Sequence, residues 1–179
     1  MRKLLIPLLA SVFVLSVTSV GYAQQSVALP DTSQTTTLTA NVSEQARVTV
    51  PSGVTFNVSN VSSNTAGGAA SVTVTSIVLA TATKQLKVSL QANAASFTPP
   101  IVGATTWSAS DVTWNAASWT NATGAAGTLS NSAYNTVATC TADVADCSTT
   151  ALVFTLGAKA TVKRAGNHTV VVTWKFESI

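Results

Sequence analysis

Few side chains in this sequence could carry out acid–base or nucleophilic chemistry. The chain of 179 residues has a single histidine, His168, and two cysteines. A serine hydrolase needs its histidine beside a serine and an acid, yet none of the many serines lies in the turn sequence that presents a nucleophile. His168 instead follows Gly166-Asn167 at the start of an alternating segment. This context favours a histidine at a turn or strand edge, so we expect no catalytic residues and no enzyme.

Asp143 and Asp146 are the only acidic residues that lie close together in the sequence. Two carboxylates on one short loop could supply oxygens to Ca²⁺, but that ion needs six or more. The segment lacks the glycine and the later glutamate of a calcium-binding loop. A solvated acidic loop is therefore favoured, and we expect no metal ion and no cofactor.

The two cysteines predict a structural disulfide. Cys140 and Cys147 are separated by TADVAD, and neither flank resembles a redox CxxC motif or a zinc-binding motif. A bridge that closes so short a loop stabilises a fold by about 2.5 kcal/mol through chain entropy. A disulfide also fits an oxidising compartment outside the cytoplasm.

Three tryptophans fall close together in TTWSASDVTWNAASWT, where small polar residues surround them. Trp107, Trp114 and Trp119 could fill the core, which is the favoured interpretation because large aromatic side chains dominate burial. They could also mark an interface between subunits. A third possibility is a row of exposed rings that stack on sugars, as in a glycan-binding module. Trp174, on the apolar face of the final alternating segment, is predicted to be core.

The charge of the chain excludes a polybasic nucleic-acid binder. Only 8% of residues are charged, and the pI near 9.1 depends partly on Arg2 and Lys3. Without these two residues, seven basic residues face six acidic ones. The one basic cluster, Lys159, Lys163 and Arg164, has no interleaved aromatic residues, so it indicates a solvated hairpin end.

The first residues match a secretory signal peptide. A positive start, Arg2-Lys3, precedes the apolar run Leu4–Val20, and Gly21-Tyr22-Ala23 offers small residues at a cleavage site before Gln24. The rival interpretation is an uncleaved membrane anchor, but the run is short and contains Pro7. We predict a signal peptide over residues 1–23 and no membrane span after its cleavage. A secreted protein follows, exported through the periplasm to the medium or cell surface.

The remaining chain alternates apolar and polar residues, which predicts β-strands. Abundant Thr and Val also favour a pleated surface over a helix. The alternating segments are Thr37–Val42, Arg47–Val50, Val54–Ser59, Ser71–Ser76, Leu86–Gln91, Leu152–Leu156 and Thr169–Phe176. One apolar face on each strand requires two sheets that bury those faces against each other. The sequence therefore predicts an all-β protein, an antiparallel immunoglobulin-like β-sandwich of about 7–9 strands. A closed barrel would also satisfy the pattern and is the less favoured alternative.

The expected organisation after the signal peptide has two parts. Residues 24–46 form an N-terminal arm or first strand, and residues 47–179 form the sandwich. The span Ala104–Ala138 shows the least regular alternation, which indicates an insertion between strands. The cysteine loop is expected to close a hairpin between Tyr134–Thr139 and Ala151–Leu156.

Two stretches resemble exported bacterial surface proteins of the immunoglobulin-like fimbrial-subunit and spore-coat-U type. They are the alternating arm TTTLTANVSEQARVTV (Thr35–Val50) and the ending AGNHTVVVTWKFESI (Ala165–Ile179), and the part of the chain between them, rich in small residues, shares the likeness. In that group the sandwich commonly lacks one strand, and the N-terminal arm of a neighbour fills the gap. This chain departs from the group in two respects: its cysteines lie late in the sequence, and its last strand lacks the usual tyrosine. The resemblance implies that residues 24–44 pair either within their own sandwich, the simpler expectation, or in a neighbouring copy.

These observations predict a non-catalytic structural or adhesive surface protein, including a self-assembling fimbria-like subunit. Its partner would be itself or another surface protein. The alternative is a secreted carbohydrate-binding module that uses Trp107, Trp114 and Trp119 to hold a glycan.

Overall fold

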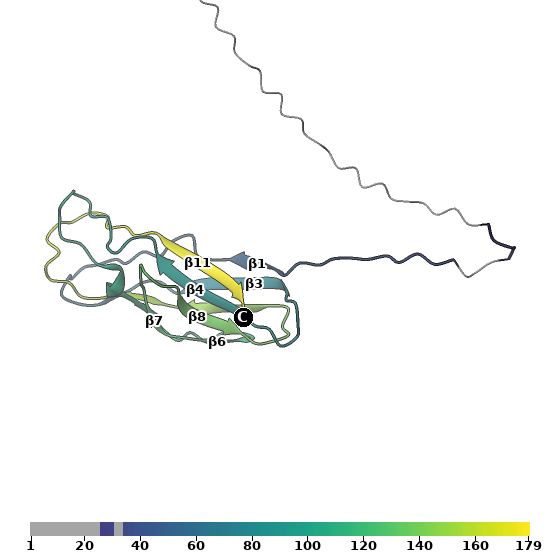
Figure 1. Ribbon diagram of the computed structural model, residues 1–179. Helices are drawn as coiled ribbons and strands as arrows, with labels where there is room; N and C mark the ends of the chain where they lie inside the picture. Colours follow the sequence, from purple (N-terminus) through teal and green to yellow (C-terminus); the bar gives the residue numbers. More distant parts are fainter. Residues whose placement is uncertain (1–25, 31–33) are drawn as a thin grey trace, which may run out of the picture. The chain divides into compact units, whose positions relative to one another are not determined.

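The computed structural model describes residues 26–30 and 34–179, so the predicted signal peptide lies outside the described residues. Two compact units are distinguished, Met1–Ala40 and Asn41–Ile179. We call the second unit the β-domain. It is all-β, with one turn of 3-10 helix, η1 (Ala109–Asp111). The fold class predicted from alternation is thereby confirmed at this level (Figure 1).

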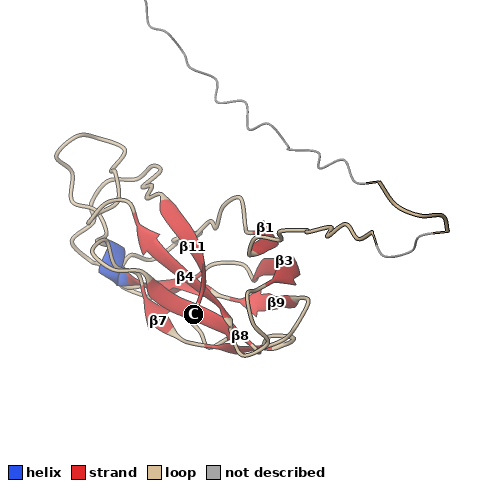
Figure 2. Ribbon diagram, turned by 45° about the vertical axis from the view of Figure 1, so that its right-hand side comes forward, coloured by secondary structure: helices blue, strands red, loops and turns tan. Residues whose placement is uncertain are grey.

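The strands of the β-domain form three antiparallel sheets, an arrangement consistent with a β-sandwich (Figure 2). One sheet has the order β1-β3-β9, the second β2-β10-β5-β7, and the third β11-β4-β8-β6. The strand bounds are β1 Gln45–Thr49, β2 Thr65–Ala66, β3 Ala70–Val78, β4 Leu86–Ala92, β5 Val112–Trp114, β6 Ala122–Gly124, β7 Gly127–Thr128, β8 Asn135–Cys140, β9 Cys147–Leu152, β10 Phe154–Leu156 and β11 Val172–Ser178.

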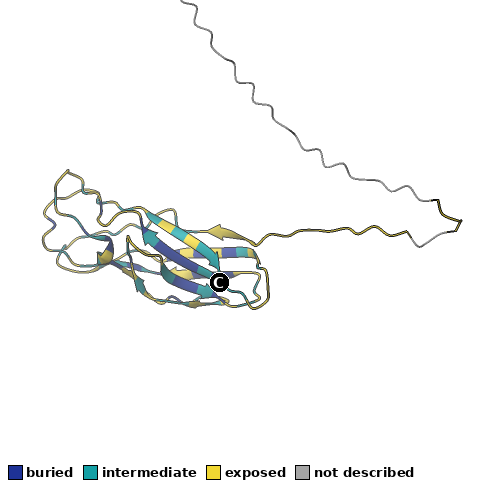
Figure 3. Ribbon diagram, viewed as in Figure 1, coloured by how far each residue is buried: buried dark blue, intermediate teal, exposed yellow. Residues whose placement is uncertain are grey.

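The core forms where the predicted alternation places apolar residues on inward faces. In β3, Val72 and Val74 are fully buried while the intervening Thr73 is exposed. In β4, Val88 and Leu90 are fully buried. Because side chains alternate across a strand, each of these strands covers the core with one face. Figure 3 shows β4 largely buried beside a much more exposed β11.

Two alternating segments differ from the prediction. Neither Thr37–Val42 nor Val54–Ser59 is a strand in the structure. Both are extended sequences with the right periodicity, but a strand also requires a neighbour that pairs with its backbone, and none of the described strands provides one. The chain thus contains more strand-forming sequence than the sheets of the β-domain use.

The predicted hairpin at the cysteine loop is wrong. The strands on either side of the loop are β8, which pairs with β4 and β6, and β9, which pairs with β3. The loop therefore crosses from one sheet to another. The predicted disulfide itself is confirmed: Cys140 and Cys147 are bonded, with both side chains fully buried and their Cα atoms 5.9 Å apart. The bridge holds two sheets together at one end of the β-domain.

Ala104–Ala138, expected as an insertion, contributes to the core. It holds η1, β5, β6, β7 and part of β8. Trp107, Trp114 and Leu129 within it are buried. Short strands and Gly-containing turns hid this contribution from a search for long alternation. In the described residues no helix is both long enough and apolar enough to cross a membrane.

Candidate functional site

The main feature of the β-domain surface is a groove of about 930 Å³ along one side. Its two margins are β11, with the residues just before it, and the segment 51–61, which belongs to no strand. Its floor consists of side chains of the core, namely Phe97, Trp107, Val112, Leu129, Phe154 and Leu156. The groove therefore reaches from the surface to the hydrophobic core.

Both margins of the groove alternate between half-buried apolar and exposed polar residues. On one side Val54, Phe56 and Val58 are half-buried, and on the other Val172 and Trp174 are. In β3 and β4 the equivalent inward residues are fully covered. The apolar residues of both margins thus face inward, as in a sandwich, but on the groove side they remain partly exposed.

One edge of β11 also lacks a paired strand on this side, because among the described strands β11 pairs only with β4. Ile179 and Gln85 exchange two backbone hydrogen bonds, of 3.0 and 3.2 Å. Since such pairs alternate along an antiparallel ladder, Thr173, Lys175 and Glu177 direct their backbone polar groups to β4. The N–H and C=O groups of the intervening residues, from Val172 to Ser178, face the open edge. An open edge of this kind is a template for another strand.

One end of the groove is basic. Lys163, Arg164 and His168 line it there, and the groove lining in the described residues contains no acidic side chain. Gly166, at φ 128°, makes the close turn next to Pro100, where a Cβ atom would clash at 2.7 Å. We call this region the basic end; it also includes the loop Pro99–Gly103.

His168 has a structural environment at the basic end. Its Nε2 lies 3.1 Å from the Arg164 carbonyl oxygen, and its Nδ1 lies 2.7 Å from the Thr106 hydroxyl. Because a carbonyl only accepts, Nε2 of the neutral ring carries the proton and Nδ1 accepts from Thr106. The ring also stands edge-on to Trp107, with centroids 5.1 Å apart. These contacts orient His168 without bringing it to a serine–acid pair.

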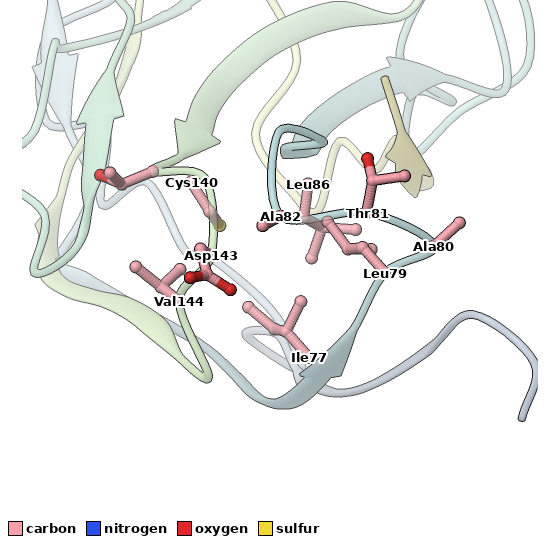
Figure 4. Close-up of a pocket in the computed structure, with 10 residues that line it drawn as sticks. Ile77, Leu79, Ala80, Thr81, Ala82, Leu86, Cys140, Asp143 and Val144 are labelled. Carbon is pink, nitrogen blue, oxygen red and sulfur yellow. The ribbon is translucent and has the colours of Figure 1, made fainter.

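The opposite end of the β-domain carries the disulfide, and we call it the disulfide end. It holds a second, smaller pocket of about 210 Å³, with apolar lining residues that include Ile77, Leu79, Leu86 and Val144 (Figure 4). Asp143 also lines this pocket and has φ 57°, a left-handed conformation that Asp tolerates. The C-terminal end of β11 lies at the same end, because Ser178 pairs with Leu86.

Glu44 connects the start of β1 to the disulfide end. Its carboxylate accepts a 2.7 Å hydrogen bond from the backbone N–H of Ala80 and one of 3.1 Å from the Ser178 hydroxyl. Lys84 lies 3.2 Å away as an ion-pair partner. The hydrogen bond from Ala80, with support from Lys84, lowers the pKa of Glu44 below its ordinary value. Glu44, directly before β1, therefore lies beside the C-terminal end of β11.

The tryptophans singled out in the sequence do not form a row of exposed rings. Trp107 and Trp114 are only 4% and 3% exposed, and their indole N–H groups donate to backbone carbonyls, of Gly157 at 2.9 Å and Ala125 at 3.0 Å. Trp114 packs against Gly127, where any Cβ atom would collide with the indole ring. Trp119 is partly buried, and its N–H is buried without a hydrogen-bond partner. Two of the three rings thus have no face free to stack on a sugar.

Asp143 and Asp146 are not joined by further metal ligands. No group of three or more His, Cys, Asp or Glu side chains suited to a metal ion occurs in the described part of the chain. Asp146 accepts a hydrogen bond from the Asn121 amide at 3.1 Å.

Sequence reasoning did not identify the groove. The sequence predicts its margins, Val54–Ser59 and Thr169–Phe176, as alternating segments. It does not indicate that no strand lies between them. The sequence did contain a signal: both the arm and Val54–Ser59 alternate like strands. The sequence alone, however, does not show how many strands the sheets can accommodate. Comparison with protein-family models, with curated proteins and with solved structures found no match.

Proposed function

We propose that this protein is a non-catalytic structural subunit of the bacterial surface that assembles by inserting its N-terminal arm into the groove of another copy. The proposal includes an immunoglobulin-like layout that lacks one strand, and export through the periplasm after signal-peptide cleavage. The observation that carries it is the groove, whose two margins expose half-buried apolar residues and an unpaired edge of β11.

The arm has the sequence that such a groove needs. Leu38, Ala40 and Val42 alternate with Thr39 and Asn41, and Leu38 and Val42 are 91% and 72% exposed. Exposed alternating apolar residues in an extended segment can pair with an edge strand and bury one face at the same time. Addition of a strand would complete both the backbone ladder of β11 and the cover of the core.

The groove does not fit the two other function classes. Among its described lining residues, only His168 and Lys163 could serve as a general base, and His168 is tied to Thr106 and Arg164. The carbohydrate-binding alternative required exposed faces on Trp107 and Trp114, and both rings are buried. No observation favours a glycan over a strand as the occupant.

The test is the mass in solution of the protein purified after export, measured by size exclusion with light scattering. We expect large or polydisperse species that become monomers when Gln24–Val42 is deleted. Val172→Arg should also abolish assembly, because it places a charge in the groove at the β11 margin. Val48→Arg is the matched control: Val48 is 45% exposed in β1 and does not line the groove, so assembly should persist.

A monomer at all concentrations would overturn the proposal. So would assembly that survives both the arm deletion and Val172→Arg. Circular dichroism and a denaturation curve on each variant would establish that the β-domain remains folded.

A further inference from the structure

We infer that the basic end is a membrane-binding surface, which inserts the tip of the Pro99–Gly103 loop into an anionic lipid bilayer and places Lys163 and Arg164 at the lipid headgroups. This surface lies at the end of the β-domain opposite the C-terminus, where the chain leaves β4 and enters β11 (Figure 1). The inference goes beyond the proposed function and does not depend on it, because it uses neither the arm nor the apolar floor of the groove.

The Pro99–Gly103 loop ends in an exposed apolar tip. Ile101 and Val102 are 58% and 100% exposed. The Ile101 carbonyl accepts a 3.1 Å hydrogen bond from the N–H of Ala104, and Gly103, at φ 80°, is the third residue of this turn. A glycine of positive φ at that position is characteristic of a type II turn, in which Val102 forms the corner. An apolar side chain there adds nothing to the core and is free to meet a partner.

A second loop lies beside this tip and carries the cations. Thr98 and Thr169 exchange two backbone hydrogen bonds, of 2.7 and 3.0 Å, which join the two loops at their bases. Gly166 approaches the Pro100 ring so closely that a Cβ atom would clash with it. Lys163 and Arg164 precede Gly166 by a few residues and are exposed. The apolar tip and the two cations thus belong to one end of the β-domain.

The positive charge of this end is not compensated. Neither residues 93–106 nor residues 160–171 include an acidic residue. Lys163 and Arg164 form no ion pair with a described residue, whereas Lys159, just before this loop, is paired with Asp111 at 2.8 Å. An anionic membrane surface attracts such cations, and each Lys or Arg near it strengthens binding by about fivefold.

A bilayer fits this combination better than another macromolecule does. A protein partner would need a pocket shaped for the protruding tip, whereas the membrane interface yields to a protrusion and holds apolar chains directly beneath its anionic headgroups. A nucleic acid would attract the cations but leave Ile101 and Val102 in water. Because the tip and the cations are each a weak signal, we expect reversible binding that requires both.

Flotation of lipid vesicles tests the inference on the exported full-length protein. Vesicles of equal parts phosphatidylcholine and phosphatidylglycerol should carry the protein upward at low salt, and added salt should release it by screening the attraction. Vesicles of phosphatidylcholine alone should carry much less. Large protein assemblies do not float by themselves, so self-association does not imitate binding. Absence of binding to the anionic vesicles at low salt, or equal binding to both kinds of vesicle, would overturn the inference.

Substitution of the tip measures the apolar contribution. Ile101→Ser/Val102→Ser should weaken binding to the anionic vesicles by about tenfold or more, since it removes the side chains that leave water. Both residues are exposed, so the fold should not change. Val48→Ser, at an exposed apolar residue of β1, is the matched control and should bind normally. Normal binding by the tip variant would show that the surface adsorbs polyanions by charge alone, and the inference would then be wrong.

Substitution of the cations measures the electrostatic contribution. Lys163→Gln/Arg164→Gln should weaken binding by about 20–30-fold. Lys84→Gln/Lys87→Gln removes the same net charge at the disulfide end, from two lysines that are paired with Glu44 and Glu177, and should have little effect. Equal losses in the two proteins would mean that overall charge, and not the basic end, directs the protein to the membrane.

A fluorophore sensitive to its environment, attached at Val102→Cys, reports insertion directly. Its emission should shift to shorter wavelength with the anionic vesicles, and brominated lipid should quench it. The same fluorophore at Val48→Cys should show neither change. Unchanged emission at position 102 in protein that floats with the vesicles would overturn the inference, because the tip would then remain in water.

Discussion

The two edges of the sheet β11-β4-β8-β6 are closed to different degrees. At the β6 edge, Thr120 bridges Ser148 of β9, with hydrogen bonds of 2.8 and 3.2 Å, and the disulfide joins β8 to β9. At the β11 edge no such bridge to β1 or to segment 51–61 occurs among the described residues, and the groove lies there. One side of the β-domain is completed by its own chain, and the other is left with apolar residues half-covered.

The difference shows that alternation fixes which residues face inward but not whether anything covers them. Val88 in β4 and Val172 in β11 follow the same pattern in sequence. Val88 has neighbours on both sides of its strand and is fully buried, whereas Val172 has a neighbour on one side. Each of the following measurements would sharpen or break this contrast.

The largest expected effect is on the closed side. Leu90→Ala should lower the free energy of unfolding by roughly 2–5 kcal/mol, because Leu90 is fully buried in β4 and its truncation leaves a cavity. Val172→Ala should cost the isolated domain only about 1 kcal/mol, since its side chain is half exposed. Denaturation of an arm-deleted protein, in which no second copy can cover the groove, would compare the two. Equal losses would mean that β11 is as well covered as β4.

Assembly should change the stability loss caused by Val172→Ala and leave the loss caused by Leu90→Ala unchanged. In the protein that keeps its arm, Val172→Ala should cost more than it does in the arm-deleted protein. Leu90→Ala should cost the same in both, because Leu90 already lacks exposure.

The disulfide is the next largest contribution to the closed side. Cys140→Ser/Cys147→Ser should lower the free energy of unfolding by about 2.5 kcal/mol, from the greater entropy of the unfolded chain. The groove is remote from this bridge, so the arm should still bind it. Measurement of the denaturation midpoint and of the mass in solution would separate the two effects. Loss of assembly without loss of stability would place the disulfide loop in the contact between copies instead.

The sequence predicted the inward residues of β3, β4 and β11 well, because their alternation is local. It also predicted the disulfide, since only two cysteines are present. It could not predict that β8 and β9 separate into different sheets, because pairing partners depend on contacts far apart in the chain. For the same reason it predicted strands at Thr37–Val42 and Val54–Ser59, although neither segment pairs with any of the described strands. The groove exists because no described strand pairs with the outer edge of β11, and local alternation in the sequence carries no information about such pairing.

The smallest expected effect concerns Glu44, where the arm joins the β-domain beside the open side. The pKa of Glu44 is lowered, chiefly by the hydrogen bond from the Ala80 N–H and then by Lys84. A carboxylate whose pKa is lowered in the folded state stabilises the fold when the pH is above its ordinary pKa, near 4.5. This contribution disappears as the pH falls through the lowered pKa. At pH 7 Glu44→Gln should therefore be slightly less stable than the unsubstituted protein, and the two stabilities should converge below pH 4.5. Denaturation curves from pH 7 to pH 3 would measure the difference, with Glu177→Gln for comparison because the pKa of Glu177 is lowered by Lys175 and Lys87. A Glu44→Gln difference that stays constant over that range would show that the carboxylate charge does not stabilise the start of β1 beside Ser178.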